Sequence, residues 1–384
     1  MKTILDIDAL NRCYACQPFS IATSDNAAHL NGQINTPPAS VSRPPLVILY
    51  PGSGLHDRHA LLGESNTASD YLFHTLAHYF LEAGFAVMRA DCRGVGGNHR
   101  SAELDRPEYR YNRQQAFHQR FVDTPARLSV TPQTQYEDAA ALYRFAAALD
   151  TVDTDNILLL GHSEGAVNIG RMLDRYQLSP RGVLLMSPPL TPLRDTMRWQ
   201  MAERCTQWLN DIPHNGETIT LEELKNGFGH SPLSSLYPIS TWLPYHGAWT
   251  QDDLQQARAQ SLAAFEQEAD RLATLPDDMP WPNAHAVHAS HAWWKQFFAH
   301  GAPIVSHFLG YAGPVSCFFG DVDTQLDYRA QLAILQQYRS ALPNWTTQVY
   351  QGLGHSLGIH GLLGPISDNA AHQLVTAARD MLAV

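Results

Sequence analysis

The stretch NILLLGHSEGAVNIG, residues 156–170, constrains the fold of this chain more than any other. An apolar run leads directly into Gly161-His162-Ser163-Glu164-Gly165, and small residues with helical character follow. This order predicts a buried strand, a sharp turn and a helix. The turn needs glycine on both sides, because a Cβ at either position would collide with the neighbouring strand or helix. It should therefore hold the Ser163 hydroxyl clear of the backbone.

The residue after Ser163 adds a second chemical feature to this turn. The amide of Glu164 falls at a helix N-terminus, where unpaired N–H groups and the helix dipole favour developing negative charge. The turn thus predicts a nucleophile beside half of an oxyanion hole. Because G-x-S-x-G is a common pattern, a second interpretation stays open, in which Ser163 only caps the helix that follows.

Length, charge and cysteine content limit the class of protein. The 384 residues suffice for one large domain with an insertion, or for two domains. A formal net charge of -11 argues against nucleic acid or an anionic membrane as the main partner. No apolar run is long enough to cross a bilayer, and the acidic N-terminal stretch is unlike a secretory signal, so we predict a cytoplasmic protein. Five scattered cysteines favour reduced thiols, with Cys13-x-x-Cys16 either two packed thiols or half of a zinc site.

Short apolar runs alternate with helical stretches through most of the chain. This alternation predicts a mostly parallel, doubly wound sheet. One or two antiparallel edge strands are expected between about residues 18 and 38. Two of the helices are expected at 69–82, with Gly84 as the stop, and at 134–149, opened by a capping box from Thr134 to Glu137. The expected buried strands are residues 46–50, 85–90, 157–160, 183–186, 314–319 and 346–350.

The alternation stops for about a hundred residues between residues 190 and 301. This segment looks helical: Thr220 to Glu223 fits a capping box, and an apolar stripe follows at Leu254, Leu262, Phe265, Ala269 and Leu272. We therefore expect an inserted helical lid at residues 190–300, between core segments 1–189 and 301–384. Such an aromatic segment packs its own small core, lines an apolar pocket, or does both. Seven of the eight tryptophans lie here: Trp199, Trp208, Trp242, Trp249, Trp281, Trp293 and Trp294.

Two other groups of residues each allow two interpretations. His285, His288 and His291 recur every three residues in the expected lid, which fits a metal site or one polar helix face. The irregular segment 98–132 is rich in arginine, and these side chains face either an anionic substrate group or solvent. They are Arg100, Arg106, Arg110, Arg113, Arg120 and Arg127.

Three types of residue with complementary chemistry fall at strand ends on the same edge of the predicted sheet. Ser163 comes first, an aspartate follows the next-to-last strand, and His355 follows the last. A serine hydroxyl is a poor nucleophile until an imidazole takes its proton, and the imidazole needs a carboxylate to hold its tautomer. From the residues alone, Asp321, Asp323 and Asp327 all remain candidates for that carboxylate.

The chain resembles the α/β-hydrolase superfamily, and in particular bacterial serine esterases with a PGSGPxDRDGN-type first loop and a GHSEG elbow. The resemblance rests on PGSGLHDRH at residues 51–59, FAVMRADCRGVG at 85–96 and GHSEG at 161–165, and it spans nearly all of the predicted core. Departures from the pattern are Leu55, His56 and His59, the long segment 98–132 and the tryptophan-rich lid. Since these regions shape the pocket, the identity of the substrate is the least transferable property.

The resemblance implies a role for each candidate residue. In that family the acid lies three residues after a strand-ending glycine, which selects Asp323 over Asp321 and Asp327. The base lies in a G-x-x-H loop after the last strand, which matches His355 rather than His360. The second oxyanion donor is the amide of Ser53, beside that of Glu164.

The function that follows is hydrolysis of a carboxylic ester or related acyl bond of a small molecule through an acyl-enzyme on Ser163. No cofactor or metal is required. An acyltransferase, a thioesterase or a peptidase would use the same triad of Ser163, Asp323 and His355. A ligand-binding protein without catalytic activity is the alternative from a different class. The sequence predicts neither the natural substrate nor the oligomeric state.

Overall fold

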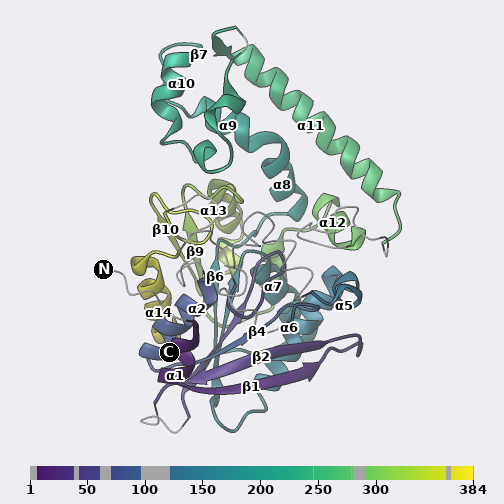
Figure 1. Cartoon of the computed structure of the whole chain (residues 1–384), viewed down its shortest axis with the longest axis vertical. Helices are drawn as coiled ribbons and strands as arrows, with labels where there is room; N and C mark the ends of the chain where they lie inside the picture. Colours follow the sequence, from purple (N-terminus) through teal and green to yellow (C-terminus); the bar gives the residue numbers. More distant parts are fainter. Residues whose placement is uncertain are drawn as a thin grey trace, which may run out of the picture.

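A computed structural model of the chain describes residues 7–38, 43–60, 71–96, 122–244, 246–277, 279, 290–359 and 365–383. Eight strands form one sheet in the order β1-β2-β4-β3-β5-β6-β9-β10 (Figure 1). The strands are β1 (Ala15–Ala22), β2 (His29–Thr36), β3 (Pro45–Tyr50), β4 (Ala86–Ala90), β5 (Asp153–His162), β6 (Gly182–Met186), β9 (Val315–Gly320) and β10 (Trp345–Tyr350).

The pairing of the strands confirms the predicted fold class. From β4 through β3, β5, β6 and β9 to β10 every pair is parallel. The two strands before them in the sheet order, β1 and β2, pair antiparallel with each other, and β2 pairs antiparallel with β4. They occupy the stretch in which edge strands were predicted. All six predicted buried strands are present, with boundaries within a few residues except for β5, which begins at Asp153.

The sheet is covered by helices on both faces, because its central strands are apolar on both sides. Along β3, Leu46 and Ile48 belong to one apolar cluster, and Val47 and Leu49 belong to the other. Side chains of α6 (Pro132–Ala146) and α7 (Glu164–Tyr176) complete the first cluster. Those of α2 (Leu72–Glu82) and α14 (Asp368–Ala383) complete the second. The other helices outside the insertion in the described residues are α1 (Ile7–Cys13), α5 (Thr124–Leu128), α13 (Tyr328–Gln337) and the short η7 (Arg339–Ala341).

The start of α6 differs from the prediction. The helix begins at Pro132, and the capping box is formed by Thr131 and Thr134 rather than by Thr134 and Glu137. Proline is favoured at the first helical position because its missing N–H would have no partner there, so Thr131 takes the capping role. The predicted end of α2 is confirmed, because the helix ends at Glu82 and Gly84 follows with a φ of +91°. Its predicted start at residue 69 lies outside the described residues.

The segment between β6 and β9, called the insertion below, is mainly helical and extends beyond the carboxyl ends of the strands (Figure 1). Its helices are α8 (Leu193–Arg198), the π-helix η3 (Trp199–Glu203), α9 (Arg204–Asn210), α10 (Leu221–Phe228), η4 (Pro232–Ser235), η5 (Ile239–Trp242), α11 (Gln251–Ala273), α12 (His291–Phe298) and η6 (Ile304–Phe308). Two short strands, β7 (Thr218–Thr220) and β8 (Ala248–Thr250), pair antiparallel within it.

The two ends of the insertion are joined to each other by hydrogen bonds. The amide of Val305 donates to the Leu190 carbonyl at 3.0 Å, and that of Ile304 donates to Thr191 at 3.4 Å. Gln331 of α13 accepts from the amides of Leu190 and Thr191 through its side-chain oxygen, at 2.7 and 3.1 Å. The segments that lead into and out of the insertion therefore lie side by side.

The insertion contains two apolar regions. Near the sheet, α12 and much of α11 pack against the main core, and Phe265 and Leu272 of the predicted stripe are buried there. Farther out is a separate cluster, called the tip, where the Thr220–Glu223 capping box confirms its prediction. The tip comprises Trp199, Trp208, Leu209, Ile212, Ile219, Leu224, Phe228, Leu233 and Leu254, with Trp242 and Trp249 packed against them.

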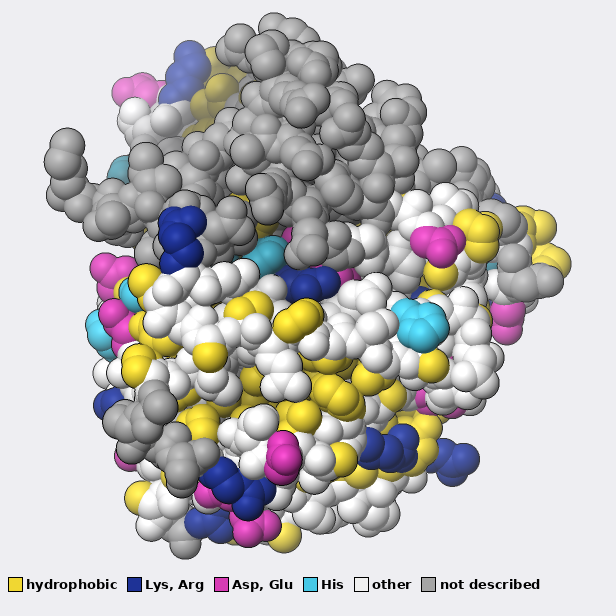
Figure 2. All heavy atoms as spheres, turned by 60° about the horizontal axis from the view of Figure 1, so that its bottom comes forward, with side chains coloured by type: hydrophobic (Ala, Val, Ile, Leu, Met, Phe, Trp, Pro, Cys, Tyr) yellow, Lys and Arg dark blue, Asp and Glu magenta, His cyan; other side chains and the backbone are white. Residues whose placement is uncertain are grey.

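The surface mixes charges of both signs. Figure 2 shows Lys and Arg side chains interspersed with Asp and Glu side chains on the face in view, around a band of hydrophobic ones. In the part of the chain that the structure describes, no helix combines the length and apolar character needed to span a membrane.

Candidate active site

Ser163 lies on a strained turn between β5 and α7. Its φ of 52° and ψ of -119° are unusual for a residue with a side chain. The flanking glycines explain how the turn closes: a Cβ on Gly165 would lie 2.2 Å from the Tyr50 carbonyl oxygen, and one on Gly161 would lie 2.8 Å from the Ala166 nitrogen. Neither contact is possible for a larger residue, so the predicted steric reason for both glycines holds.

The loops after β9 and β10 bring an acid and a base together. His355 Nδ1 donates to the Asp323 carboxylate, with distances of 2.8 and 3.1 Å to its two oxygens. Both side chains are buried. Gly320 ends β9, and a Cβ there would lie 2.0 Å from the Leu353 carbonyl oxygen. The close approach of these two loops therefore depends on glycine at position 320.

The other candidate acids have different partners. Asp321 accepts from the amide of Gly352 at 2.7 Å, and Asp327 caps α13 through the amide of Arg329 at 3.1 Å. Each therefore stabilises local backbone rather than the imidazole. His360, the alternative base, lies outside the described residues.

His162, the residue before Ser163, contacts His355. The His162 ring donates through Nε2 to the His355 carbonyl at 3.2 Å, and the two ring centroids are 4.9 Å apart. Burial, followed by the neighbouring His355, lowers the pKa of His162 well below its usual value. His162 is therefore a neutral hydrogen-bond donor that ties the serine turn to the His355 loop.

The loop after β3 lies directly against Ser163. A Cβ on Gly52 would be 3.1 Å from the Ser163 Cβ, so a larger residue there would force the two segments apart by a few tenths of an ångström. The next residue, Ser53, makes a side-chain hydrogen bond to Glu164. The structure thus brings together Ser53 and Glu164, the two residues whose amides were predicted to form the oxyanion hole.

The Glu164 carboxyl group is a buried junction between several elements. Trp293 of α12 donates its indole N–H to Glu164 Oε1 at 2.5 Å, and Gln135 of α6 makes a further side-chain hydrogen bond to Glu164. Burial raises the pKa of Glu164, against the opposing effect of these hydrogen bonds and of Arg171. The sequence analysis considered only the amide of Glu164, so the role of its side chain was missed.

Two departures from the esterase pattern have structural roles in the loop after β3. His56 donates through Nε2 to the Ser53 carbonyl at 2.9 Å, and burial lowers its pKa. His59 is buried and lies 6.1 Å, centroid to centroid, from the Tyr71 ring. Between them, Arg58 forms a buried ion pair with Asp91 at 2.6 Å. A hydrogen bond, a buried ion pair and an aromatic contact therefore fix the conformation of the loop after β3.

The insertion also holds the loop that bears Asp323. Arg204 donates to the Thr324 carbonyl at 2.5 Å, and Gln200 donates to the Gln325 carbonyl at 2.6 Å. Gln200 belongs to the π-helix η3, a type of irregularity often found near functional sites. Because both acceptors directly follow Asp323, the base of the insertion fixes the backbone that orients the acid.

The remaining predicted sites receive little support. All five cysteines are unpaired, and Cys13 and Cys16 are exposed. Within the described residues no group of three or more histidine, cysteine or acidic side chains is arranged to hold a metal. Of the histidine triplet, only the buried His291 is described; His285 and His288 are not. Of the six arginines of segment 98–132, Arg127 alone is described, and it is buried.

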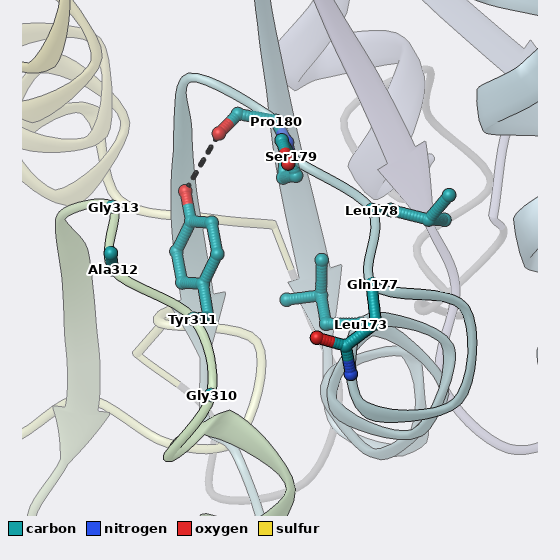
Figure 3. Close-up of a pocket in the computed structure, with 9 residues that line it drawn as sticks. All are labelled: Leu173, Gln177, Leu178, Ser179, Pro180, Gly310, Tyr311, Ala312 and Gly313. Carbon is teal, nitrogen blue, oxygen red and sulfur yellow. Dashed lines mark hydrogen bonds between the residues drawn. The ribbon is translucent and has the colours of Figure 1, made fainter.

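Two hollows in the described part of the chain lie at opposite ends of the parallel strands. The one in Figure 3, of about 210 Å³, is lined by residues 177–180 and 310–313, which precede β6 and β9. Tyr311 donates to the Pro180 carbonyl beside it at 3.0 Å. It therefore lies away from Ser163. The second, of about 80 Å³, is lined in part by Pro51, Gly52 and Gly54 of the loop against Ser163.

The second hollow is also lined by Gln135 and Asn168, which the sequence analysis did not single out. A signal for Asn168 was present, since it lies four residues after Glu164 and so on the same face of α7. Gln135 had no such signal. The sequence predicted that α6 begins at residue 134 rather than at Pro132, which gives Gln135 the wrong position in the first turn of the helix.

The pattern of the alpha/beta hydrolase fold family matches residues 45–362. No curated protein matches this chain. Among solved structures, DcsB in complex with its substrate analogue is 16% identical, with a TM-score of 0.52 over 96% of this chain and 99% of that one. A lipase in its open form is 14% identical, with a TM-score of 0.51 over 96% and 99%.

Est1E from Butyrivibrio proteoclasticus is 12% identical, with a TM-score of 0.45 over 95% and 99% of the two chains. At such low identities, structural similarity speaks only for the fold. The family pattern is the stronger finding, since it spans most of the chain. On that basis, and with its mostly parallel sheet, the chain belongs to the α/β hydrolase fold family.

Proposed function

We propose that this protein is a serine hydrolase that cleaves a carboxylic ester, or a related acyl bond, of a small molecule. His355 removes the proton of Ser163 as the hydroxyl oxygen attacks the acyl carbonyl. The amides of Ser53 and Glu164 stabilise the oxyanion, and His355 then protonates the leaving group. Water attacks the acyl-enzyme by the same route and releases the acid.

The observation that most favours this proposal is the hydrogen bond from His355 Nδ1 to Asp323 at 2.8 Å. A carboxylate in this place holds the imidazole with Nε2 available for the serine proton, and it stabilises the imidazolium that forms. The strained backbone of Ser163 supports the same role, because strain of this kind persists where the surrounding structure requires it.

We also propose that residues 190–300 act as a lid over this edge of the sheet. Two contacts support this: Trp293 reaches Glu164 beside the nucleophile, and Arg204 reaches the backbone beside Asp323. Closure of such a segment excludes water from the reacting groups and strengthens the electrostatic interactions among them.

Labelling with a fluorophosphonate probe tests the nucleophile without knowledge of the substrate. We expect wild-type protein to be labelled on Ser163, as located by peptide mapping. Ser163→Ala should lose labelling and at least about a thousandfold of p-nitrophenyl acetate hydrolysis, with an unchanged melting temperature. Labelling that persists in folded Ser163→Ala would refute the proposal. Product analysis with and without an alcohol acceptor separates hydrolysis from acyl transfer.

A further inference from the structure

The small cavity beside the loop after β3 is placed to receive part of a substrate. Gly52 lines it, and the same glycine packs against the nucleophile, since a Cβ at position 52 would lie 3.1 Å from the Ser163 Cβ. The other walls come from the ends of β3 and β4, from α6 and from Asn168 of α7. Gly52 therefore belongs both to the wall of the cavity and to the immediate surroundings of Ser163.

The size of the cavity limits what it holds. Its volume is about 80 Å³. On this measure one water molecule needs roughly 10–15 Å³, so the space suits about five to eight non-hydrogen atoms. A short acyl group fills such a space, whereas a long hydrocarbon chain extends out of it.

Two amide oxygens make the wall polar. Gln135 Oε1 and Asn168 Oδ1 are buried and accept no hydrogen bond from the described part of the chain. The orientation of Gln135 has a physical cause, because its side chain bonds to the Glu164 carboxyl group. The hydrogen bond from Gln135 lowers the pKa of Glu164, which is the effect of a bond donated to a carboxylate, so the Gln135 NH₂ group faces Glu164 and its oxygen is left for another donor. Buried acceptors of this kind normally find a partner.

The charges of the wall select among possible partners. Asp91 is paired with Arg58 at 2.6 Å, and Arg93 is paired with both Asp25 at 2.6 Å and Asp138 at 2.8 Å, so each of these charges has an opposite partner. Arg127 also lines the cavity and donates to the Gly54 carbonyl at 3.4 Å.

These groups disfavour charged and purely apolar ligands. A carboxylate would attract Arg127 but would repel the oxygens of Gln135 and Asn168. An ammonium group would attract those oxygens but would face the Arg127 guanidinium. A methyl group would leave both amide oxygens unsatisfied, which costs free energy in a buried site. A hydroxyl group is neutral, donates to one of the two amide oxygens and can accept from Arg127, so among these groups it matches the wall best.

We propose that this cavity is the acyl subsite and that it selects short acyl groups carrying a hydroxyl near the carbonyl, such as the acyl groups of 2-hydroxy acids. The inference rests on the proposed hydrolysis at Ser163 and adds the class of substrate. The hydroxyl donates to the oxygen of Asn168 or Gln135, and the remainder of the small acyl group fills the space beside Gly52.

Matched pairs of esters test this substrate class. Methyl lactate and methyl isobutyrate differ by a hydroxyl in place of a methyl group, as do methyl glycolate and methyl propionate. Each kcat/KM is measured by titration of released acid and divided by the rate constant for hydroxide-catalysed hydrolysis of the same ester, which removes intrinsic reactivity. We expect the hydroxyl member to be favoured about tenfold or more, with one lactate enantiomer preferred.

Variants of the wall show whether the cavity is responsible. Asn168→Leu and Gln135→Met remove the acceptor oxygens at similar volume, and at least one should lower the lactate-to-isobutyrate ratio about tenfold. Gln133→Met is the matched control, because Gln133 is an exposed residue of the same helix that bonds to Glu137. It should leave the ratio unchanged.

The outcomes separate this inference from the proposed function. Equal normalised rates for both members of each pair, or a preference unaffected by both wall variants, would overturn the hydroxyacyl subsite even if Ser163→Ala is inactive on every ester. Activity that survives Ser163→Ala would instead overturn the proposed function.

Discussion

The carboxyl edge of the sheet and the tip of the insertion both depend on buried aromatic and polar side chains, but in different ways. At the edge, Trp293 donates its indole N–H to Glu164, the residue after Ser163. In the tip, Trp249 donates its indole N–H to the Trp242 carbonyl at 2.7 Å, and the Trp199 and Trp208 rings pack edge to face. The edge contacts join distant parts of the chain, whereas the tip contacts join neighbours within one cluster.

This difference shows that seven tryptophans in one segment do not share one role. The tryptophans of the tip pack into a small core of their own, which is one of the two roles that the sequence predicted for this aromatic segment. Trp293 and the partly buried Trp294 instead pack against the main core, next to the candidate active site. Trp281 lies outside the described residues. The predictions below test whether activity depends on the edge alone, and they run from the largest expected effect on activity to the smallest.

Asp323→Asn should lower kcat by about a thousandfold or more, because an amide in place of the carboxylate favours the wrong imidazole tautomer. Asp321→Asn is the matched control, since Asp321 bonds only to backbone at Gly352 among the described contacts. It should cost far less activity. Steady-state kinetics on p-nitrophenyl acetate measures both. A larger loss for Asp321→Asn would mean that the acid has been assigned to the wrong residue.

Trp293→Phe should lower kcat/KM by about tenfold. The change keeps an aromatic ring but removes the N–H that bonds to the buried Glu164 carboxyl, and such bonds contribute about 1.5–3 kcal/mol when one partner is charged. Trp249→Phe removes the same type of bond in the tip and should change kcat/KM by less than about twofold. Equal losses of kcat/KM in the two variants would contradict the conclusion that only the edge contacts support activity.

Glu164→Gln should change the pH dependence of stability. Burial raises the pKa of Glu164 above 4.5, so the protonated carboxyl contributes stability that is present below about pH 4.5 and is lost as pH rises through the folded-state pKa. The glutamine variant stays neutral. Its melting temperature relative to wild type should therefore increase with pH across that window, by about 1–2 °C for each 1.4 kcal/mol.

A carboxylate of the tip should behave in the opposite way. Hydrogen bonds from Thr220 and Asn215 lower the pKa of Glu223, so its stabilising contribution is present at neutral pH and is lost on acidification. Glu223→Gln should thus match wild type more closely as the pH falls. Melting curves recorded from pH 4 to pH 9 compare both variants, and a pH-independent difference for Glu164→Gln would contradict a raised pKa.

Trp208→Leu should have the smallest effect on activity, within about twofold. Trp208 is buried in the tip, and its truncation should cost about 2–4 kcal/mol of local stability through lost packing. Limited proteolysis with peptide mapping should show faster cleavage within the tip at unchanged kcat/KM. A marked loss of activity would mean that the tip supports the active site after all.

The sequence predicted those features that depend on local chemistry and on periodicity. Short apolar runs that alternate with helical stretches predicted the strands and their positions along the chain. Gly161 and Gly165 predicted the turn, because a Cβ at either place would collide with its neighbours. The same local reasoning failed at α6, where two overlapping capping patterns compete. Pro132 decided between them, since its preference for the first helical position favours Thr131 as the cap.

The tertiary structure decided which side chains meet across long distances in the chain. Residues alone left Asp321, Asp323 and Asp327 as candidate acids, and only the close approach of the β9 and β10 loops at Gly320 places one of them on His355. The contacts of Glu164 with Ser53, Gln135 and Trp293 likewise join four separate segments. Helical and strand periodicity describes which face of an element is buried, but it contains no information on which partner from another segment that face will contact.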